Sequence, residues 1–508
     1  MPKTLTSMLA PHRDAALAIG AAKKSWLTYG ALRELSQSVC ARLRQSGVGA
    51  TDRVAIVLPN GPHMATAFVT IAQAATTAPL NPNYREDEFA FYLEDLNAKA
   101  IVLEAGYEGA ALAAAQRAGL TIMRLHADEK VAGKFDLVSE TSAEPARENL
   151  PRAQDVALIL HTSGTTSRPK IVPLLHANIT ASAHHIATSL DLTSRDRCMN
   201  VMPLFHIHGL IAAVTASLSV GASIWCTSGF NAMTFFSSMA EANPTWYTAV
   251  PTMHQAILSR AGRNGETIVS NPLRFLRSSS ASLPAQVMAS LQETFNAPVI
   301  EAYGMTEAAH QMCCNPLSQQ KPGSVGVAAG PEVRIAHELE NHLIEGIGEV
   351  VISGPNVTPG YESNPEANAK NFFEAENKRW FRTGDQGSFD SDGFLELTGR
   401  LKEIINRGGE KISPLEVDGV LMDFPAIGQV VTFALPHPKL GEEVAAAVVL
   451  RDGQSATARE IRDFAASRMA DFKVPRLVVI LDEIPKGATG KMQRIGMAEK
   501  LGLVETAS

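Results

Sequence analysis

The stretch DVALILHTSGTTSRPK, residues 155–170, joins a short apolar run to a segment rich in hydroxyl groups. Residues 155–160 have the pattern of a buried strand, and open α/β sheets bind ligands where such strands end. The groups suited to phosphate oxygens are the hydroxyls of Thr162, Ser163, Thr165 and Thr166, the backbone at Gly164 and the ammonium of Lys170. The stretch therefore predicts a phosphate-binding loop in an α/β protein, although a solvated turn has the same composition.

This loop differs from the P-loop of Walker-type NTPases. The motif GxxxxGK[ST] places a glycine directly before the lysine and a hydroxyl directly after it. Residues 167–171 read SRPKI, so Lys170 follows a proline and precedes an isoleucine. A Walker-type NTPase is therefore disfavoured, and a different kind of phosphate site is expected.

Short apolar runs alternate with longer helix-like segments on both sides of the loop, from about residue 28 to about residue 300. The apolar runs are residues 53–60, 76–82, 99–106, 155–164, 221–227, 244–251 and 297–304. Most of them end in Gly, Pro, Ser or Asn, and segment 64–74 is a clear helix candidate between two of them. Such alternation predicts parallel strands joined by crossover helices.

After about residue 320 the sequence becomes rich in short strands punctuated by glycine. GIGEVVISG (346–354) and WFRTGDQGSFDSDGFLELTGR (380–400) are the clearest examples. This pattern favours a β-rich lobe at about 320–399. We expect the lobe to complete a large N-terminal domain of βα layers that spans residues 1–399.

A second alternation of helices and strands begins at Leu401. The expected helices are residues 415–424 and 459–470, and the expected strands are residues 427–436, 443–453 and 476–485. About a hundred residues with their own apolar elements suffice for a separate domain. The fold class is therefore α/β, with a small α+β C-terminal domain, residues 403–508, joined through a short connection at 400–402.

Composition and charge disfavour several classes of protein. A net charge of −7 without a local run of Lys or Arg disfavours nucleic acid as a partner. Five scattered cysteines fit neither a disulfide framework nor a zinc site, and they favour a cytoplasmic protein with reduced thiols. The segment MPKTLTSMLAPHRD lacks the apolar centre of a signal peptide, and no run of about 18 apolar residues occurs, so we expect neither export nor a membrane span.

Four further motifs give the loop a context: YGMTE (303–307), TGD (383–385), GRLKEIINRGGEKISPLEVD (399–418) and PKGATGK (485–491). Together with HTSGTTSRPK, and in this order and spacing, they resemble the motif series of the adenylate-forming acyl-CoA synthetase family. Ser167 and Ile171 depart from the series, because relatives often carry glycine at these positions.

The resemblance implies a reaction in two steps. A carboxylate attacks the α-phosphate of ATP to give an acyl-adenylate and pyrophosphate, and the thiol of coenzyme A then displaces AMP. The implied partners are a small carboxylic acid, ATP and coenzyme A, with Mg²⁺ as cofactor. The protein itself is expected to be a monomer or a homodimer. A carrier-protein-loading adenylation enzyme shares the first step, and a non-catalytic nucleotide-binding protein is a further alternative.

The resemblance assigns roles in the first step to individual residues. Lys491 corresponds to the lysine that bridges the carboxylate and the α-phosphate, and Thr306 to a hydroxyl that contacts the same phosphate. Glu307 corresponds to the carboxylate that holds Mg²⁺. The presence of Lys491, Glu307 and Asp385 together argues against a non-catalytic protein.

The resemblance also implies where the nucleotide binds. Tyr303 offers an aromatic face for adenine, while Asp385 and Arg400 correspond to the groups that hold the ribose hydroxyls. The loop at 161–170 holds the phosphates that leave as pyrophosphate. The other expected nucleotide-binding positions are Ser280, Ala281, Ser282, Glu301, Ala302 and Gly304.

In the second step the resemblance implies that the C-terminal domain rotates about a hinge at Lys402. Lys491 then leaves the α-phosphate so that the thiol can reach the acyl group. Gly408, Gly409 and Lys411 are expected to line the coenzyme A channel, where glycines allow a close backbone approach.

The pocket for the acid is expected beside the α-phosphate. His206 in PLFHIHGL (203–210) corresponds to the family's gating position, and His208 is expected to face away from it, because alternate residues of an extended segment point to opposite sides. Residues 278–283 read SSSASL where relatives that admit fatty chains commonly read Ser-Gly-Gly-Ala-Pro-Leu. The tunnel should therefore be shorter and more polar.

Ser280, His310 and Arg277 are expected to line this pocket together with His206. Such groups suit an acid with a second carboxylate, because a buried charge requires paired charge or hydrogen bonds. The motifs PLFHIHGL, SASL and NRGGEKISP also resemble those of the oxalate-using branch of the family. Oxalate is therefore the expected acid, followed by malonate or another short acid, and then by a medium-chain fatty or aryl acid.

Overall fold

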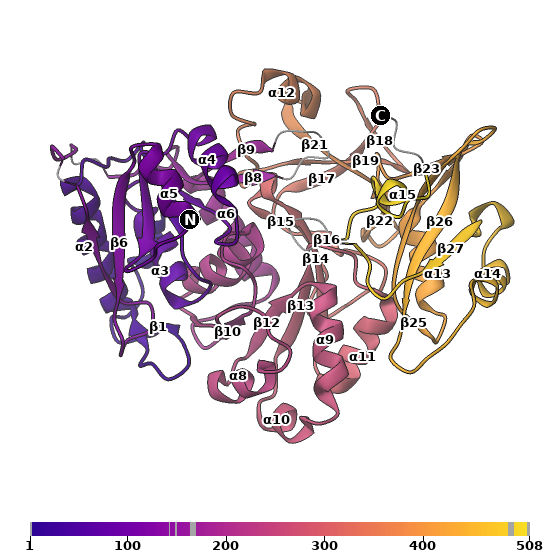
Figure 1. The fold of residues 1–508 in the computed structure, drawn as a ribbon, viewed down its shortest axis with the longest axis horizontal. Helices are drawn as coiled ribbons and strands as arrows, with labels where there is room; N and C mark the ends of the chain where they lie inside the picture. Colours follow the sequence, from indigo (N-terminus) through magenta and orange to yellow (C-terminus); the bar gives the residue numbers. More distant parts are fainter. Residues whose placement is uncertain (1–2, 142, 148–149, 163–168, 486–491, 505–508) are drawn as a thin grey trace.

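The computed structural model describes residues 3–141, 143–147, 150–162, 169–485 and 492–504. It confirms an α/β protein built on four sheets (Figure 1). The two larger sheets use strands from residues 17–328, the third uses residues 332–400 and the fourth uses residues 405–480. None of the described helices combines the length and the apolar character needed to cross a membrane.

A seven-stranded sheet carries the predicted phosphate loop at its edge. In spatial order its strands are β7 (Phe135–Ser139), β6 (Thr121–Ala127), β5 (Ala100–Glu104), β3 (Arg53–Val57), β4 (Thr76–Pro79), β8 (Val156–Thr162) and β9 (Lys170–Leu175). The preceding and connecting helices are α1 (Leu5–Leu9), α2 (Tyr29–Gln45), α3 (Pro62–Ile71), α4 (Glu86–Asp95) and α5 (Ala110–Arg117). The inner strands are parallel, as expected, but β9 returns antiparallel to β8 and pairs Lys170 with Thr162.

A nine-stranded sheet forms the second half of the large domain. Its order is β16 (Val327–Ala328), β15 (His310–Cys314), β14 (Val299–Met305), β13 (Phe275–Ser279), β12 (Trp246–Ala249), β10 (Arg197–Asn200), β11 (Ser223–Cys226), β1 (Leu17–Gly20) and β2 (Leu27–Thr28). Its helices are α6 (His176–Ser189), η1 (His208–Thr215), α7 (Ala216–Ser219), α8 (Phe235–Ala242), α9 (Pro251–Ala261), α10 (Gly265–Ser270) and α11 (Ala285–Phe295). Strands β12, β13 and β14 run parallel, so their carboxyl ends lie at one edge.

The largest apolar core contains side chains from both of these sheets, including Ile56 and Trp246, together with residues of α3, α6 and η1. Helix η1 has π-helical geometry, and all eight of its residues are buried. Its sequence HGLIAAVT is apolar almost all round, which is typical of a helix that lies inside a core. Its first residue, His208, is therefore fixed in the protein interior.

The β-rich lobe and the C-terminal part follow as separate sheets. The lobe contains β17 (Glu332–Ala336), β18 (Leu343–Ile344), β19 (Gly348–Ser353), β20 (Phe372–Ala375), β21 (Lys378–Phe389), β22 (Leu395–Arg400) and α12 (Pro365–Asn371). The C-terminal part contains β23 (Ile405–Arg407), β24 (Glu410–Ile412), β25 (Ile427–His437), β26 (Gly441–Leu450), β27 (Leu477–Ile480), α13 (Pro414–Met422), α14 (Ala458–Ala466), η3 (Asp471–Lys473) and α15 (Met497–Lys500). This part has apolar cores of its own.

Candidate active site

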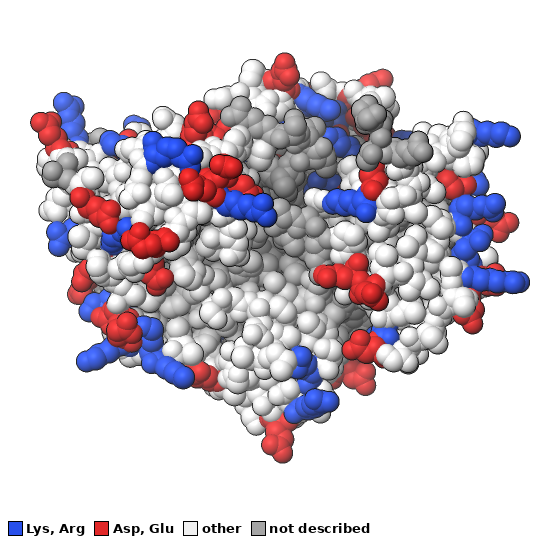
Figure 2. Space-filling view, in the orientation of Figure 1, with Lys and Arg blue, Asp and Glu red and all other residues white. Residues whose placement is uncertain are grey.

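The YGMTE segment spans the carboxyl end of β14 and the short helix η2 (Thr306–Ala308), near the middle of the molecule (Figure 1). Figure 2 shows this face hollowed near its centre, with Lys and Arg side chains on both sides of the hollow. Parallel strands bring their polar end residues together at such an edge. Of the residues expected in the site, Tyr303 and Glu307 lie on β14 and η2, and Asp385 and Arg400 lie on β21 and β22.

Tyr303, Asp385 and Arg400 form a connected group. The Tyr303 hydroxyl donates a hydrogen bond to the Asp385 carboxylate, and Arg400 Nε lies 3.3 Å from Asp385 Oδ1. Asp385 and Arg400 face each other as register partners on β21 and β22. The Asp385 carboxylate raises the pKa of the Arg400 guanidinium, because it favours the charged form. The structure thus brings together the three residues expected to contact adenosine.

Glu307 lies deeper, beside the end of the predicted phosphate loop. Its side chain is buried, and its Oε1 accepts a hydrogen bond of 2.8 Å from the Tyr361 hydroxyl. Lys170 Nζ lies 4.3 Å from the centroid of the Tyr361 ring, so one aromatic side chain contacts both charged groups. Burial raises the pKa of Glu307 and lowers that of Lys170. Sequence reasoning missed Tyr361, because PGYESN carries no signal that separates it from an ordinary turn.

The phosphate loop is described only at its two ends. Thr162 and Lys170 are paired across β8 and β9, so the loop connects the two strands of a hairpin. Ser163, Gly164, Thr165 and Thr166 lie outside the described residues, as does Lys491. Thr306 is half-buried at the first position of η2, beside Glu307.

Ser280 and His310 converge with His208. His208 Nδ1 lies 3.0 Å from Ser280 Oγ, and the centroids of the His208 and His310 rings are 5.0 Å apart. Ser280 has φ 74° and His310 has φ 94°, a left-handed backbone region that non-glycine side chains seldom occupy. Such strain at two neighbouring polar residues is typical of a functional site.

His208 makes these contacts, which corrects the expectation that His208 faces elsewhere. That expectation required an extended segment, whereas Leu204 and Phe205 form a turn and His208 begins helix η1. His206 is half-buried, and its ring lies 4.5 Å from that of Phe205. A turn in PLFHIHGL cannot be predicted from alternation alone.

Arg277 lies behind Ser280 and His208. Its side chain is completely buried on β13, where Nη1 donates to Thr248 Oγ1 at 3.4 Å and Nη2 to Gln311 Oε1 at 3.0 Å. No acidic side chain among the described residues forms an ion pair with it. Burial lowers the pKa of Arg277 to about 10, so the guanidinium is charged at neutral pH.

Several expected nucleotide-binding residues connect β14 to the segment that carries Ser280. Glu301 is buried and accepts a hydrogen bond of 2.9 Å from the Leu283 backbone N–H, which ties β14 to the segment that carries Ser280. The Ala302 carbonyl accepts a hydrogen bond from the Ser279 hydroxyl. A Cβ on Gly304 would lie 1.4 Å from the His310 carbonyl oxygen, so only glycine fits there. Ala281 and Ser282 are exposed.

The expected coenzyme A residues lie on a hairpin of the C-terminal part. Gly408 and Gly409 have φ 61° and φ 99° and form the turn between β23 and β24. Lys411 Nζ lies 2.7 Å from Glu338 Oε2 of the lobe. Lys402 belongs to the turn that follows β22, at the place expected for a hinge.

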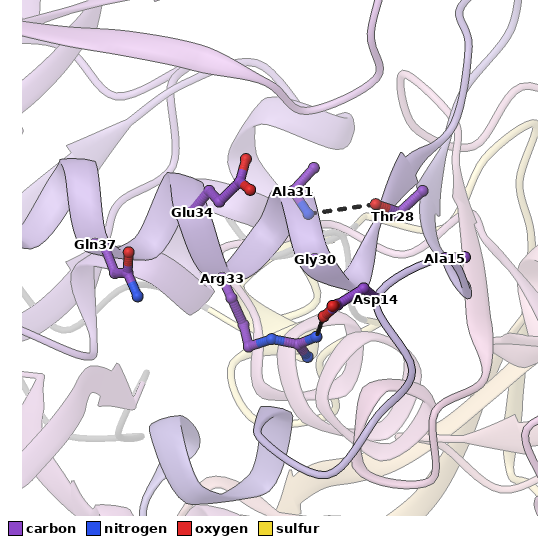
Figure 3. Close-up of a pocket in the computed structure, with 8 residues that line it drawn as sticks. All are labelled: Asp14, Ala15, Thr28, Gly30, Ala31, Arg33, Glu34 and Gln37. Atoms are coloured by element: carbon purple, nitrogen blue, oxygen red, sulfur yellow. Dashed lines mark hydrogen bonds and ion pairs between the residues drawn. The ribbon is translucent and has the colours of Figure 1, made fainter.

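A separate surface hollow of about 550 Å³ lies at the start of α2 (Figure 3). Figure 3 shows its Arg33 guanidinium paired with Asp14, and the Thr28 hydroxyl accepting from the Ala31 backbone N–H. Arg33 and Asp14 thus satisfy each other, and Thr28 caps α2. The candidate active site is the region around Glu307 and His208, where most of the expected residues gather.

Comparison with known proteins identifies the class. Residues 8–362 match the family model of the AMP-binding enzyme, and residues 416–491 match that of the AMP-binding enzyme C-terminal domain. The chain therefore belongs to the AMP-binding enzyme family.

Individual relatives are similar over nearly the whole chain. An oxalate–CoA ligase of Arabidopsis thaliana is 45% identical over 490 residues, which cover 94% of each protein. An oxalate–CoA ligase of Saccharomyces cerevisiae is 43% identical and covers 88% of this chain and 86% of its own. The solved structure of ATP-bound MatB from Rhodopseudomonas palustris has a TM-score of 0.86 at 27% identity, covering 98% of this chain and 99% of its own, whereas apo MatB has a TM-score of 0.79.

Proposed function

We propose that this protein is an ATP-dependent acid–CoA ligase that converts oxalate to oxalyl-CoA, AMP and pyrophosphate. The observation that carries the proposal is the polar cluster of His208, Ser280 and His310, next to the nucleotide-binding candidates at the end of β14. The similarity to two oxalate–CoA ligases supports the same acid.

The first step must bring a carboxylate to the α-phosphate of ATP although both are anions. Positive charge and oriented donors at that phosphate lower the barrier. We assign this role to Lys491 and the Thr306 hydroxyl, while Lys170 and the loop residues hold the leaving pyrophosphate. Tyr303, Asp385 and Arg400 would keep the nucleoside in place.

Mg²⁺ fits the donor set around Glu307. Among the described residues no three His, Cys, Asp or Glu side chains gather into a metal-binding cluster. Mg²⁺ is commonly held by one or two carboxylates plus substrate phosphates and water, so a single buried carboxylate is sufficient. The bound ion would neutralise phosphate charge, and the hydrogen bond from the Tyr361 hydroxyl would hold the Glu307 carboxylate in place.

The second step requires room for the coenzyme A thiol. We propose that residues 403–508 rotate about Lys402 as a domain, relative to residues 1–399, and bring the Gly408–Gly409 turn to the site. The higher TM-score against ATP-bound than against apo MatB supports the view that the present arrangement belongs to the first step.

The five cysteines are free thiols, and four of them are buried, which fits the expectation of a reducing, cytoplasmic compartment. We expect no nucleic-acid partner and either a monomer or a homodimer.

An acid panel tests the proposed substrate. Oxalate, malonate, succinate, octanoate and cinnamate are compared by AMP release with ATP, Mg²⁺ and coenzyme A present. We expect oxalate to have the highest kcat/KM and malonate to follow. In His310→Ala the kcat/KM for oxalate should fall at least about tenfold, while the KM for ATP changes little. A higher kcat/KM for octanoate than for oxalate in the wild type would refute the proposal that the acid site is small and polar.

A further inference from the structure

A buried chain of polar groups continues from Ser280 through His208 to Thr248 and Arg277. His208 Nε2 lies 2.6 Å from Thr248 Oγ1, and Arg277 Nη1 donates to the same oxygen. Thr248 and Arg277 are register partners on β12 and β13. All three side chains are buried, so the rigid sheet fixes this chain of contacts.

The donor and acceptor roles in the chain follow from the Arg277 end. A guanidinium can only donate hydrogen bonds, so Thr248 Oγ1 accepts from Arg277. The Thr248 hydroxyl proton then has one acceptor among the described contacts, His208 Nε2. A neutral His208 that accepts at Nε2 carries its proton on Nδ1 and donates to Ser280 Oγ. The Ser280 hydroxyl is left to donate its own proton into the acid pocket.

The charge of Arg277 favours the same state of His208. The guanidinium and the imidazole contact one hydroxyl group from two sides in a water-poor interior. A second positive charge on His208 would be repelled by the first, because electrostatic interactions are strong at low dielectric. Arg277 therefore acts on the acid through Thr248, His208 and Ser280, and not by direct contact.

We propose that Thr248 and Arg277 are positioning residues for acid selectivity, which hold His208 in its Nδ1-protonated form so that Ser280 is a hydrogen-bond donor to the carboxylate of the substrate. This inference rests on the proposed oxalate–CoA ligase activity. It concerns two residues that lie one layer behind the pocket and that bind neither ATP nor coenzyme A in the assignment above.

Thr248→Val tests the proposal, because valine keeps the shape of threonine and lacks the hydroxyl. The KM for oxalate should rise about tenfold, with the KM for ATP within about twofold of the wild type. Thr248→Ser restores a hydroxyl and should recover most of the affinity for oxalate. Thr77→Val is the matched control, since Thr77 is also a buried strand residue whose hydroxyl donates a hydrogen bond. Its acceptor is the Ala157 carbonyl, and both residues lie in the seven-stranded sheet, not in the sheet that carries Thr248.

A double-mutant cycle with Ser280→Ala separates positioning from general damage. If Thr248 acts through Ser280, adding Thr248→Val to Ser280→Ala should raise the KM for oxalate by less than about twofold. Additive effects, equal losses for oxalate and ATP, or an unchanged KM in Thr248→Val would each overturn the proposal. Absence of oxalate-dependent AMP release in the wild type would instead refute the proposed function.

Discussion

At the scale of single residues, the position of His310, a residue of the proposed acid site, depends on a glycine in the neighbouring strand. Gly304 on β14 faces the His310 carbonyl so closely that a Cβ would lie 1.4 Å from the oxygen. The register of β14 against β15 shifts at this point, which places His310 at the start of β15 with φ 94°. The glycine in YGMTE thus sets the position of the histidine that follows it.

Gly304→Ala should therefore destabilise the protein by about 3 kcal/mol or more and abolish activity with oxalate, because two backbones would have to separate. Thermal unfolding and AMP release measure the two effects. Gly262→Ala is the control, since Gly262 has φ −59° and open space around its Cβ position. A fully active Gly304→Ala protein with an unchanged Tm would contradict the packing argument.

Glu301 gives a second prediction at this scale. Burial raises the pKa of Glu301 to about 8, from 4.5 for an ordinary glutamate. Between these values the folded protein keeps a proton that the unfolded chain loses, so the contribution of Glu301 to stability falls as pH rises from about 4.5 to 8. Glu301→Gln removes this titration but keeps an acceptor for Leu283 N–H. The gain in Tm of the variant over the wild type should grow from pH 5 to pH 8; a constant difference would show that Glu301 does not titrate in this range.

At the scale of elements, a chain of contacts connects the C-terminal part to Asp385, a residue proposed to bind the ribose. Lys411 on β24 pairs with Glu338, which also accepts a hydrogen bond of 2.7 Å from the Gln386 side chain. Gln386 directly follows Asp385 on β21. These contacts favour the domain arrangement seen in the structure.

Glu338→Gln removes the ion pair and should slow adenylation about two- to fivefold, because partly exposed ion pairs contribute at most about 1 kcal/mol. ATP–pyrophosphate exchange measures this step. Thioester formation from preformed adenylate should be unchanged or faster. Glu340→Gln, two residues along the same loop, is the control, and an equal effect of both substitutions would argue against the contact chain.

Much of the element order could be predicted from the sequence, because apolar runs and glycine punctuation are local signals. The antiparallel strands β9 and β15, the π-helix η1 and the turn before it were not predicted. These elements are defined by pairing and burial against distant segments, which local patterns do not report. For the same reason His208 could not be identified as a neighbour of Ser280, nor Thr248 as a neighbour of His208. Residues within contiguous motifs, such as Tyr303 and Glu307, could be identified as site candidates.

At the scale of the whole molecule, two sheets and a lobe carry the residues proposed to bind the nucleotide and the acid, and a separate C-terminal sheet carries the glycine hairpin expected at the thiol channel. A ligase that works in two steps needs both the large part and the C-terminal part, and we propose that the two parts are arranged differently in each step. We propose that the polar cluster of His208, Ser280 and His310 commits this molecule to a short acid with a second carboxylate.

The most direct test is to measure the product itself. With limiting oxalate, and with ATP, Mg²⁺ and coenzyme A in excess, mass-resolved chromatography should detect oxalyl-CoA and AMP, each in a one-to-one ratio to the oxalate consumed. Octanoate in place of oxalate should give little acyl-CoA. Formation of octanoyl-CoA at a higher rate, or AMP release without oxalyl-CoA, would contradict the account.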